Sequence, residues 1–323
     1  MTRAVRIHEH GGPEVLRVER VEVGEPGVGE ARVRHVAVGL NFIDTYHRSG
    51  RYPLALPSGL GTEAAGVVEA LGPDVTGFAV GDRVATASGP LGACSEARVV
   101  PVDRLVPLPD DVDARTAAAM MLKGLTAHYL LLRTRALAPG TTVLFHAAAG
   151  GVGLIFCQWA AALGVRVIGT VSTAAKAELA RANGCAQTIL PGEDLVARVR
   201  ELTGGAGVEV AFDAVGRDTI VRSLDCIAPL GLLVSFGQAS GPVPPLELLE
   251  LTRRGSLFVT RPSLATHVGR REALLGAAAA LFAVVRQGAV KVTVGQTFPL
   301  AEVEAAHRAL EARATVGSTL LLP

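Results

Sequence analysis

Two patterns of apolar and polar positions divide the 323-residue chain. Up to about residue 115, β-branched residues often alternate with polar ones in short runs that glycine and proline interrupt. This pattern is typical of strands in a compact barrel or sandwich. The expected strands are AVRIHE, VLRVERVEV, EARVRHVAVGL, GVVEAL, DRVATA and EARVVP.

From Asp113 onward the pattern changes to alternating helices and strands. Residues 113–137 predict a helix with Asp113 as its N-cap. The strands that follow are apolar throughout, as expected when helices cover both faces of a parallel sheet. These βα units over residues 123–264 predict a doubly wound domain. The elements after residue 264 break this rhythm, and we expect them to return to the first domain.

The composition excludes several classes of protein. Hydrophobic residues make up 49% of the chain and charged residues 19%, so it can bury a large core. A net charge of +1 gives no electrostatic case for binding nucleic acid or an anionic membrane. No uncharged apolar run reaches the roughly 18–20 residues of a membrane span. The N-terminus lacks the apolar region of a signal peptide. We expect a soluble cytoplasmic protein.

The spacing of the cysteines and histidines gives no sign of a metal site. The four cysteines form no CxxC pair, so neither a zinc lobe nor a redox dithiol is expected. None of the eight histidines stands at metal-ligand spacing from another ligand. The sequence therefore predicts no metal.

The segment TVLFHAAAGGVG, which begins at residue 142, has the form of a dinucleotide-binding strand, loop and helix start. Ala148 stands where the fingerprint usually has its first glycine, and a methyl group is tolerable there if φ is negative. Gly150 would let the backbone approach a pyrophosphate, and Gly153 would let the helix pack against the strand. The free N–H groups of the helix N-terminus favour an anion. This context predicts dinucleotide binding.

The end of the next strand distinguishes the two nicotinamide cofactors. An acid there would bind the ribose hydroxyls of NAD and repel a 2′-phosphate, but none occurs between Val165 and Lys176. Ser172 and Thr173 can donate hydrogen bonds, and Lys176 can reach a phosphate as a point charge. The alternative is that Lys176 is an ordinary solvated helix residue. The missing acid favours NADPH.

A set of motifs along nearly the whole chain identifies a family. They are HGGPEVL, GLNFIDTYHRSGRYP, LPSGLGTEAAGVVEALG, GDRV, LKGLTAHYLL, HAAAGGVG, DAVGRDT, SFGQ, VTRPSL and RATVGSTLL. The chain resembles the zinc-independent NADPH:quinone oxidoreductases, which are bacterial relatives of zeta-crystallin in the medium-chain dehydrogenase/reductase superfamily. The resemblance implies an α/β fold with two domains. A GroES-like β-rich catalytic domain would span 1–122 and 265–323, and a Rossmann doubly wound parallel-sheet domain would bind NADPH at 123–264.

The metal ligands of the zinc members are missing. Those members carry a cysteine ahead of a GHE motif, whereas this chain has Asn41 in GLNFIDTY and Gly61-Thr62-Glu63 without a histidine. Alcohol oxidation through a metal alkoxide is then disfavoured. Reduction of a quinone or a conjugated enone remains, because hydrogen-bond donors can stabilise the oxyanion that forms. The sequence does not separate these two acceptors.

Three side chains in one stretch are the candidate donors to this oxyanion: Asn41, Tyr46 and Tyr52. The resemblance implies that this stretch faces the nicotinamide. The alternative is that Asn41 only caps the following helix and that the tyrosines close a pocket wall. His47 and His128 fall close to the same place and are expected to be wall or surface residues.

The resemblance also implies the cofactor contacts. The nicotinamide half would meet Phe42, Asp44, Thr45, Tyr46 and Tyr129. The pyrophosphate would lie on Gly150, Gly151, Val152 and Gly153. The 2′-phosphate would meet Ser172, Thr173, Lys176 and Arg313. Further contacts would come from Ser235, Phe236, Gly237, Gln238, Arg261 and Ser263. Bacterial relatives often have a tyrosine where this chain has Leu190-Pro191, so a stacking or phosphate contact is expected to be lost.

Two further expectations concern partners. The apolar strand at 256–260 would be exposed at a sheet edge, and antiparallel pairing with a second copy would cover it and give a homodimer. Some zeta-crystallin relatives act as nucleotide-bound structural or RNA-binding proteins, which is the alternative to an enzyme. The absence of a basic cluster argues against that alternative.

Overall fold

The computed structural model describes all 323 residues, which form two compact units. The first unit comprises residues 1–125, 268–282 and 292–323, and the second comprises 126–267 and 283–291. Residues 283–291, which were expected in the first domain, belong to the second unit. The division falls inside the helix Arg271–Arg286, whose continuous apolar pattern carries no sign of a boundary.

The first unit is built mainly on antiparallel strands. Its larger sheet has seven strands, with the eleven-residue strand β3 (Glu30–Leu40) hydrogen-bonded to β5, β7 and β16. A second sheet of three strands has the order β2-β1-β4. The other strands of the unit are β1 (Thr2–Ile7), β2 (Arg17–Val21), β4 (Ser58–Gly59), β5 (Glu63–Leu71), β6 (Arg83–Thr86), β7 (Ala97–Pro101), β8 (Val106–Pro107), β15 (Val294–Pro299) and β16 (Ser318–Leu322).

Burial along β3 explains why its residues form a strand in this position. Buried and more exposed positions alternate over the first two thirds of EARVRHVAVGL, and its last four residues are all buried. One core of the unit gathers apolar side chains of β1, β3, β16 and α10 (Val303–Glu311). A separate cluster packs Val33 of β3 against Val68, Val84 and Val100. Burial of these side chains supplies most of the driving force for this fold.

The helix α1 (Phe42–Arg48), which carries several predicted site residues, is held by a buried arginine. Arg48 is 2% exposed, and it donates to Nδ1 of His307 at 2.9 Å and to the Glu311 carboxylate at 2.6 Å. Both partners lie on α10. Its Nε also donates to the carbonyl of Gly11. The position of α1 is therefore set by the C-terminal part of the chain.

The second unit contains a six-stranded sheet in which every neighbouring pair is parallel. The spatial order is β11-β10-β9-β12-β13-β14, the doubly wound order whose switch point lies between β9 and β12. The strands are β9 (Thr142–Phe145), β10 (Arg166–Thr170), β11 (Gln187–Ile189), β12 (Val208–Asp213), β13 (Ile227–Ser235) and β14 (Phe258–Thr260). The predicted α/β fold class is confirmed.

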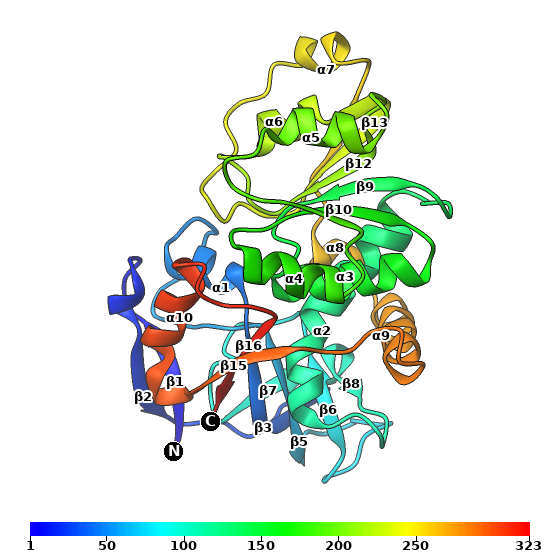
Figure 1. The fold of residues 1–323 in the computed structure, drawn as a ribbon. Helices are drawn as coiled ribbons and strands as arrows, with labels where there is room; N and C mark the ends of the chain where they lie inside the picture. The colour runs from blue at the N-terminus through cyan, green and yellow to red at the C-terminus, as the bar shows by residue number, and fades with distance from the viewer. The chain divides into compact units, whose positions relative to one another are not determined.

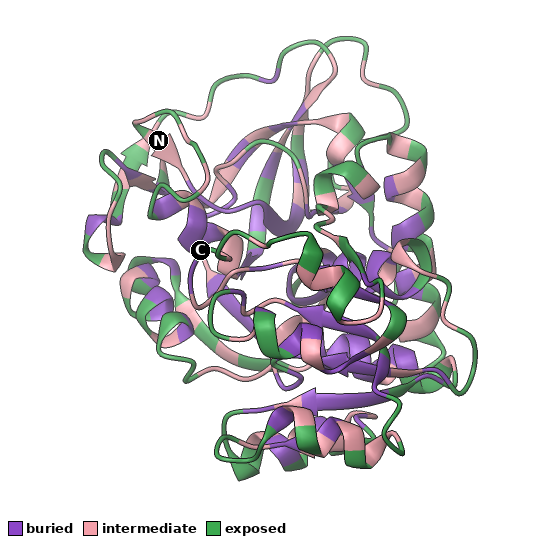
Figure 2. Cartoon of the chain, turned by 90° about the horizontal axis from the view of Figure 1, so that it is seen from above, coloured by how far each residue is buried: buried purple, intermediate pink, exposed green.

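Helices cover both faces of this sheet. Figure 1 shows α3 (Gly151–Ala162) and α4 (Ala174–Ala182) on one face, with α5 (Leu195–Leu202) and α6 (Ile220–Asp225) on the other. Figure 2 shows the sheet strands largely buried, whereas the helices alternate between buried and exposed positions. The shorter α7 (Leu249–Arg253) and α8 (Leu264–His267) follow β13 and β14. No helix of the chain combines the length and the apolar character that crossing a bilayer requires.

The helix expected at 113–137 is shorter than predicted. It forms α2 (Ala114–Tyr129), and a π-helical turn follows at Leu130–Thr134. The Asp113 carboxylate accepts the N–H groups of Arg115 and Thr116, so the predicted N-cap is confirmed. The apolar pattern of 130–137 resembles a further helical turn, which is why the sequence did not reveal the change.

Candidate functional site

The loop between β9 and α3 has the geometry expected of a pyrophosphate-binding loop. Gly150 is the N-cap of α3, and a Cβ atom there would come no closer than 3.2 Å to the protein, at the carbonyl of Ala147. A Cβ at Gly153 would lie 2.5–2.6 Å from the carbonyl oxygens of Ala148 and Ala147. Gly153 therefore allows the close helix–strand contact, whereas Gly150 leaves space open beside the backbone.

The alanine in the first fingerprint position is accommodated by a glycine on the next strand. The left-handed conformation in this loop falls on Ala147, with φ of 59°, and not on Ala148. A Cβ at Gly169 of β10 would lie 2.5 Å from the Ala148 methyl group. The methyl group thus fills the space that Gly169 leaves free, and the loop does not need a glycine at 148.

The turn after β10 carries the residues predicted to meet a 2′-phosphate. Ser172 is exposed, and Thr173 is the N-cap of α4, where its hydroxyl oxygen accepts the N–H of Lys176 at 3.2 Å. The Lys176 side chain is half-buried on the first turn of α4. The turn brings two hydroxyl groups and one cation together without a carboxylate. Arg313 follows α10 in the first unit, and its contact with the cofactor stays a prediction.

Other predicted residues of the second unit follow the carboxyl ends of β13 and β14. Arg261 donates to the Ser235 hydroxyl at 3.1 Å and to the Gly237 carbonyl at 3.5 Å. Ser263 is exposed and accepts the N–H of Thr266. Tyr129 is buried and stacks on His267 with ring centroids 4.5 Å apart. Phe236 and Gln238 are half-buried in the segment after β13.

The first unit contains a buried polar cluster around Glu63, Lys123 and Asn41. Glu63 is fully buried, and its Oε2 accepts hydrogen bonds from Lys123 Nζ at 2.9 Å and from Asn41 Nδ2 at 2.8 Å. Its Oε1 accepts the N–H of Leu122 at 2.7 Å. A Cβ at Gly39 would lie 2.1 Å from Glu63 Oε2, so only glycine fits opposite the carboxylate. The negative charge of Glu63 is compensated within the chain by Lys123.

This cluster determines what Asn41 can do. Its amide group donates to the carbonyl of Gly39 at 3.1 Å as well as to Glu63, so both N–H bonds are occupied. The amide then presents an acceptor oxygen, and Asn41 is not oriented as the oxyanion donor predicted from the sequence. Its backbone N–H donates to Asp44 at 2.8 Å, as in one half of a capping box. Asn41 begins α1, and its side chain orders the polar cluster.

Asp44 is a buried acid with one unsatisfied oxygen. Its Oδ2 accepts the N–H of Asn41, whereas Oδ1 has no hydrogen-bond partner. Burial raises the pKa of this carboxyl to about 7, although the Asn41 hydrogen bond and the charge of Lys123 act in the opposite direction. The neighbouring charge of Glu63 raises the pKa further. Asp44 therefore changes protonation close to neutral pH.

Replacing Asp44 with asparagine is expected to remove a loss of stability that the wild-type protein undergoes as pH rises. The folded-state pKa lies above the unfolded value of 3.8, so the folded protein binds more protons between pH 4 and 7 and loses stability as pH rises. The variant lacks this loss. Its free energy of unfolding should therefore rise relative to wild type by about 1.4 kcal/mol per pH unit in that window. Urea unfolding from pH 4.5 to 7 measures the slope, and equal slopes would contradict the pKa of Asp44.

The predicted tyrosines form an aromatic group with their neighbours on and after α1. Tyr46 packs edge-on against Tyr52 with ring centroids 5.3 Å apart, and Phe42 lies 6.4 Å from Tyr46. Arg51 lies over the Tyr46 ring at 5.8 Å. His47 contacts Tyr52, and burial lowers its pKa, so it is neutral at pH 7. The structure thus brings Tyr46 and Tyr52 together.

His128 is in a different environment, beside Trp159 in the second unit. Burial lowers its pKa too. The four cysteines are free and buried, and no group of three or more His, Cys, Asp or Glu side chains is arranged to hold a metal ion.

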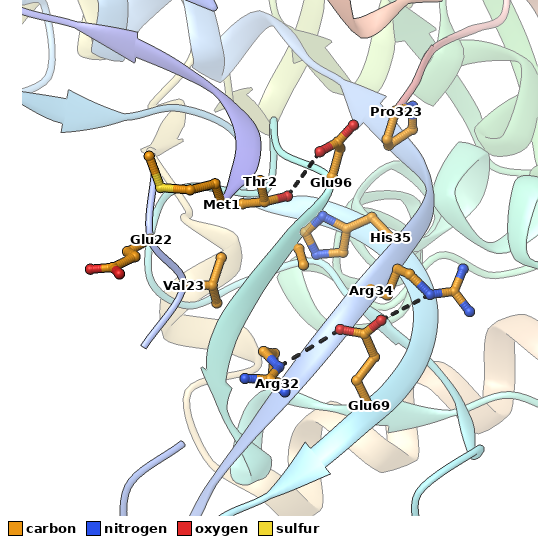
Figure 3. A pocket seen from close by; sticks show the side chains of 11 residues that line it. Met1, Thr2, Glu22, Val23, Arg32, Arg34, His35, Glu69, Glu96 and Pro323 are labelled. Atoms are coloured by element: carbon orange, nitrogen blue, oxygen red, sulfur yellow. Dashed lines mark hydrogen bonds and ion pairs between the residues drawn. The ribbon is translucent and has the colours of Figure 1, made fainter. Parts of the chain in front are cut away.

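A cavity of about 630 Å³ in the first unit includes none of the predicted site residues. Figure 3 shows Arg32 and Arg34 paired with Glu69 among its lining side chains. Arg34 Nε lies 3.0 Å from one Glu69 oxygen and Arg32 Nε lies 3.7 Å from the other, while Glu96 accepts the Thr2 hydroxyl. This charged, polar surface does not suit an apolar quinone ring, and we do not assign the acceptor to it.

Sequence reasoning missed the roles of Glu63 and Lys123. Each is a single charged residue within an apolar run, TEAAGVV and AAAMMLKGLTA. A lone charge in such a run is a signal of a buried, paired group, because an unpaired one would be too costly to bury. Their pairing across 60 residues is visible only in the structure.

Comparison with known proteins places these features in a family. The alcohol dehydrogenase GroES-like domain matches residues 27–110, and the zinc-binding dehydrogenase domain matches residues 151–272. The quinone oxidoreductase of Pseudomonas aeruginosa is 54% identical over 325 residues, covering all of both chains. The 2-haloacrylate reductase of a Burkholderia species is 47% identical, covering 100% of this chain and 99% of its own.

A solved structure agrees with both fold and sequence. The Escherichia coli quinone oxidoreductase complexed with NADPH has a TM-score of 0.98 and 50% identity, covering 99% of this chain and all of its own. The similarity includes both units, and the matched domains contain Asn41 and Glu63 of the polar cluster as well as Gly151 and Gly153 at the start of α3. The family predicted from the motifs is confirmed: the chain belongs to the quinone oxidoreductases of the medium-chain dehydrogenase/reductase superfamily.

Proposed function

We propose that this chain is an NADPH-dependent quinone oxidoreductase that transfers hydride from the nicotinamide to the quinone. Its membership of the family, at about half identity to relatives named for this activity, supports the reaction. The observation that carries the cofactor assignment is the acid-free turn after β10, in a doubly wound sheet and in a chain whose relative of known structure holds NADPH. A panel of benzoquinones and naphthoquinones with NADPH and NADH tests it, and no NADPH oxidation with any acceptor would refute it.

The chemistry on the acceptor side requires few groups. Hydride addition to a quinone leaves an oxyanion, which hydrogen-bond donors stabilise. Because both Asn41 N–H bonds are occupied, the Tyr46 and Tyr52 hydroxyls are the donors we propose, and Asn41 would position the start of α1. Water can protonate a hydroquinone anion, so a dedicated acid is not essential.

A conjugated enone or acid is the second candidate acceptor. The observation that favours it is the 47% identity to a relative named 2-haloacrylate reductase. An enolate is a stronger base than a hydroquinone anion and depends more on a donor. Activity with enones that falls further than quinone activity when Tyr46 and Tyr52 are changed to phenylalanine would support this candidate.

Reversing the charge of Lys176 is expected to weaken NADPH binding selectively. A charge-assisted hydrogen bond to a phosphate contributes about 1.5–3 kcal/mol. The Lys176→Glu variant should therefore raise the KM for NADPH by roughly 10- to 100-fold and change the KM for NADH by less than about 3-fold. Steady-state kinetics at saturating quinone measures both.

Lys291→Glu is the matched control for this prediction. Lys291 is an exposed lysine of the same unit that lies outside the predicted site. The Lys291→Glu substitution introduces the same change of net charge as Lys176→Glu, so a general electrostatic effect would appear in both variants. An equal rise of the two KM values in Lys176→Glu would contradict a 2′-phosphate contact.

We also propose that two copies associate through β14. This strand lies at the edge of the six-stranded sheet and has a neighbour only on the β13 side. Phe258 and Val259 are 59% and 42% exposed, so an apolar edge is left bare. Antiparallel pairing about a two-fold axis would continue the sheet into a second copy. Sedimentation equilibrium should show a dimer for the wild type and a monomer for Val259→Lys, whereas Val80→Lys, an exposed valine of the first unit, should remain dimeric.

A further inference from the structure

A buried histidine stands immediately before the pyrophosphate loop and has no role in the reaction described so far. His146 follows the last residue of β9 and is 1% exposed. Its Nδ1 lies 3.0 Å from the Thr170 hydroxyl and its Nε2 lies 2.8 Å from the Ser223 hydroxyl. Thr170 ends β10, and Ser223 belongs to α6. The imidazole therefore joins three separate elements of the second unit.

These hydrogen bonds form a series that ends at the Asp213 carboxylate. The direction of each bond follows from this carboxylate. Asp213 can only accept, and its Oδ2 accepts the Ser223 hydroxyl at 2.7 Å. The Ser223 oxygen lies 3.0 Å from the carbonyl of Thr219 as well, but the carboxylate is the nearer and stronger acceptor. Ser223 then accepts from Nε2–H of His146, so Nδ1 is left as an acceptor for the Thr170 hydroxyl.

The chain of hydrogen bonds ends on the backbone of the loop itself. The Thr170 oxygen, having donated its proton to His146, accepts the N–H of Ala147 at 3.3 Å. Ala147 is the residue with the left-handed φ of 59°, a conformation that is unfavourable for a residue with a Cβ atom. Burial lowers the pKa of His146, with the charge of Asp213 acting in the opposite direction, so the imidazole is neutral as this pattern requires.

Asp213 anchors the other end of this series of hydrogen bonds. It is fully buried at the end of β12, and its Oδ1 accepts the N–H groups of Val215 and Gly216. The Thr219 hydroxyl also donates to it. The network thus ties the β12 end to the β9 and β10 ends, on both sides of the switch point where dinucleotides bind in such sheets.

We propose that His146 is a positioning residue for the cofactor, which holds the left-handed turn at Ala147 and thereby the N–H groups at the start of α3. It would act through the loop and not by touching the substrate. This inference rests on the proposed function, because it takes the β9–α3 loop as the pyrophosphate site. The same hydrogen bonds would be made in the absence of NADPH, so the loop is preorganised before the cofactor binds.

The test compares two replacements of His146 by fluorescence titration with NADPH. His146→Leu removes both hydrogen bonds and should raise the Kd for NADPH at least about 10-fold, while the KM for quinone at saturating NADPH stays within twofold. In His146→Gln the amide can still donate to Ser223 and accept from Thr170, so most of the affinity should return. A purely structural role would lower stability without raising the Kd for NADPH more than the KM for quinone.

Two further variants keep the proposal falsifiable if His146→Leu does not fold. Ser223→Ala removes only a hydroxyl group, cuts the link to Asp213 and should also raise the NADPH Kd. His35→Leu replaces another buried histidine, which lies in the first unit outside the predicted site, and should leave the NADPH Kd unchanged. If Ser223→Ala binds NADPH as wild type does, and so does His146→Leu where it folds, the assignment is overturned. A wild-type protein that binds no NADPH would instead refute the proposed function.

Discussion

Replacing Lys123 with methionine is expected to destabilise the protein by about 3–5 kcal/mol, because it leaves the Glu63 carboxylate buried without its cation. Lys123 is 5% exposed and Glu63 is fully buried, so water cannot take the place of the ammonium group. For a unit of this size the loss corresponds to a fall in Tm of about 10 °C or more. Differential scanning calorimetry measures it.

The same change is expected to reduce activity through Asn41. One oxygen of Glu63 holds both Lys123 and the Asn41 amide, so a carboxylate that shifts or takes up a proton moves the start of α1. Small displacements of positioning groups can cost up to about 100-fold in rate. We expect kcat/KM for quinone to fall at least about 10-fold.

Two controls separate the buried charge from other effects of the substitution. In the Glu63→Gln/Lys123→Met double variant neither position of the pair carries a charge, so it should recover most of the stability but not the activity. Arg34→Met breaks an exposed ion pair with Glu69, in which the arginine side chain is 56% exposed, and should cost less than about 1 kcal/mol. A loss in Lys123→Met no greater than in Arg34→Met would contradict the buried pair.

The local pattern of the chain predicts the elements well but not their partners. The apolar runs after residue 140 predict a parallel sheet because helices must cover both of its faces, and the observed order bears this out. The alternation of apolar and polar residues in EARVRHVAVGL likewise predicts β3 with its observed ends. These properties depend on neighbours in the sequence, so the sequence is sufficient to predict them.

The contacts that accommodate Ala148 and occupy the Asn41 amide join residues that are far apart in the sequence. Ala148 departs from the glycine fingerprint, and only the fold shows that Gly169 on the neighbouring strand makes room for its methyl group. Asn41 carries donors in the sequence, but the structure uses both of them on Gly39 and Glu63. The identity of a side chain therefore predicted the polar character of the site, whereas its role depended on partners that no local pattern specifies.

The two glycines of the β9–α3 loop are expected to respond differently to the same added methyl group. In Gly153→Ala the Cβ would lie 2.5–2.6 Å from two backbone oxygens, which cannot move without displacing β9 from α3. Such overpacking costs about 1–3 kcal/mol. The cost should appear without any ligand, as a lower midpoint in urea unfolding, and NADPH binding should weaken with it.

Gly150→Ala is expected to leave stability within about 0.5 kcal/mol of wild type, because its Cβ has a single neighbour at 3.2 Å. If the pyrophosphate lies against this backbone, as we propose, the methyl group would occupy its place and the Kd for NADPH should rise at least about 10-fold. Gly276→Ala is the matched control: it lies in the helix α9 (Arg271–Arg286) with no atom within 4 Å of the added Cβ, and it should gain about 0.5–1 kcal/mol from helix propensity. The methyl group added in Gly153→Ala clashes with the protein, whereas the one added in Gly150→Ala enters open space. A Gly150→Ala variant with unchanged NADPH affinity would therefore place the pyrophosphate elsewhere.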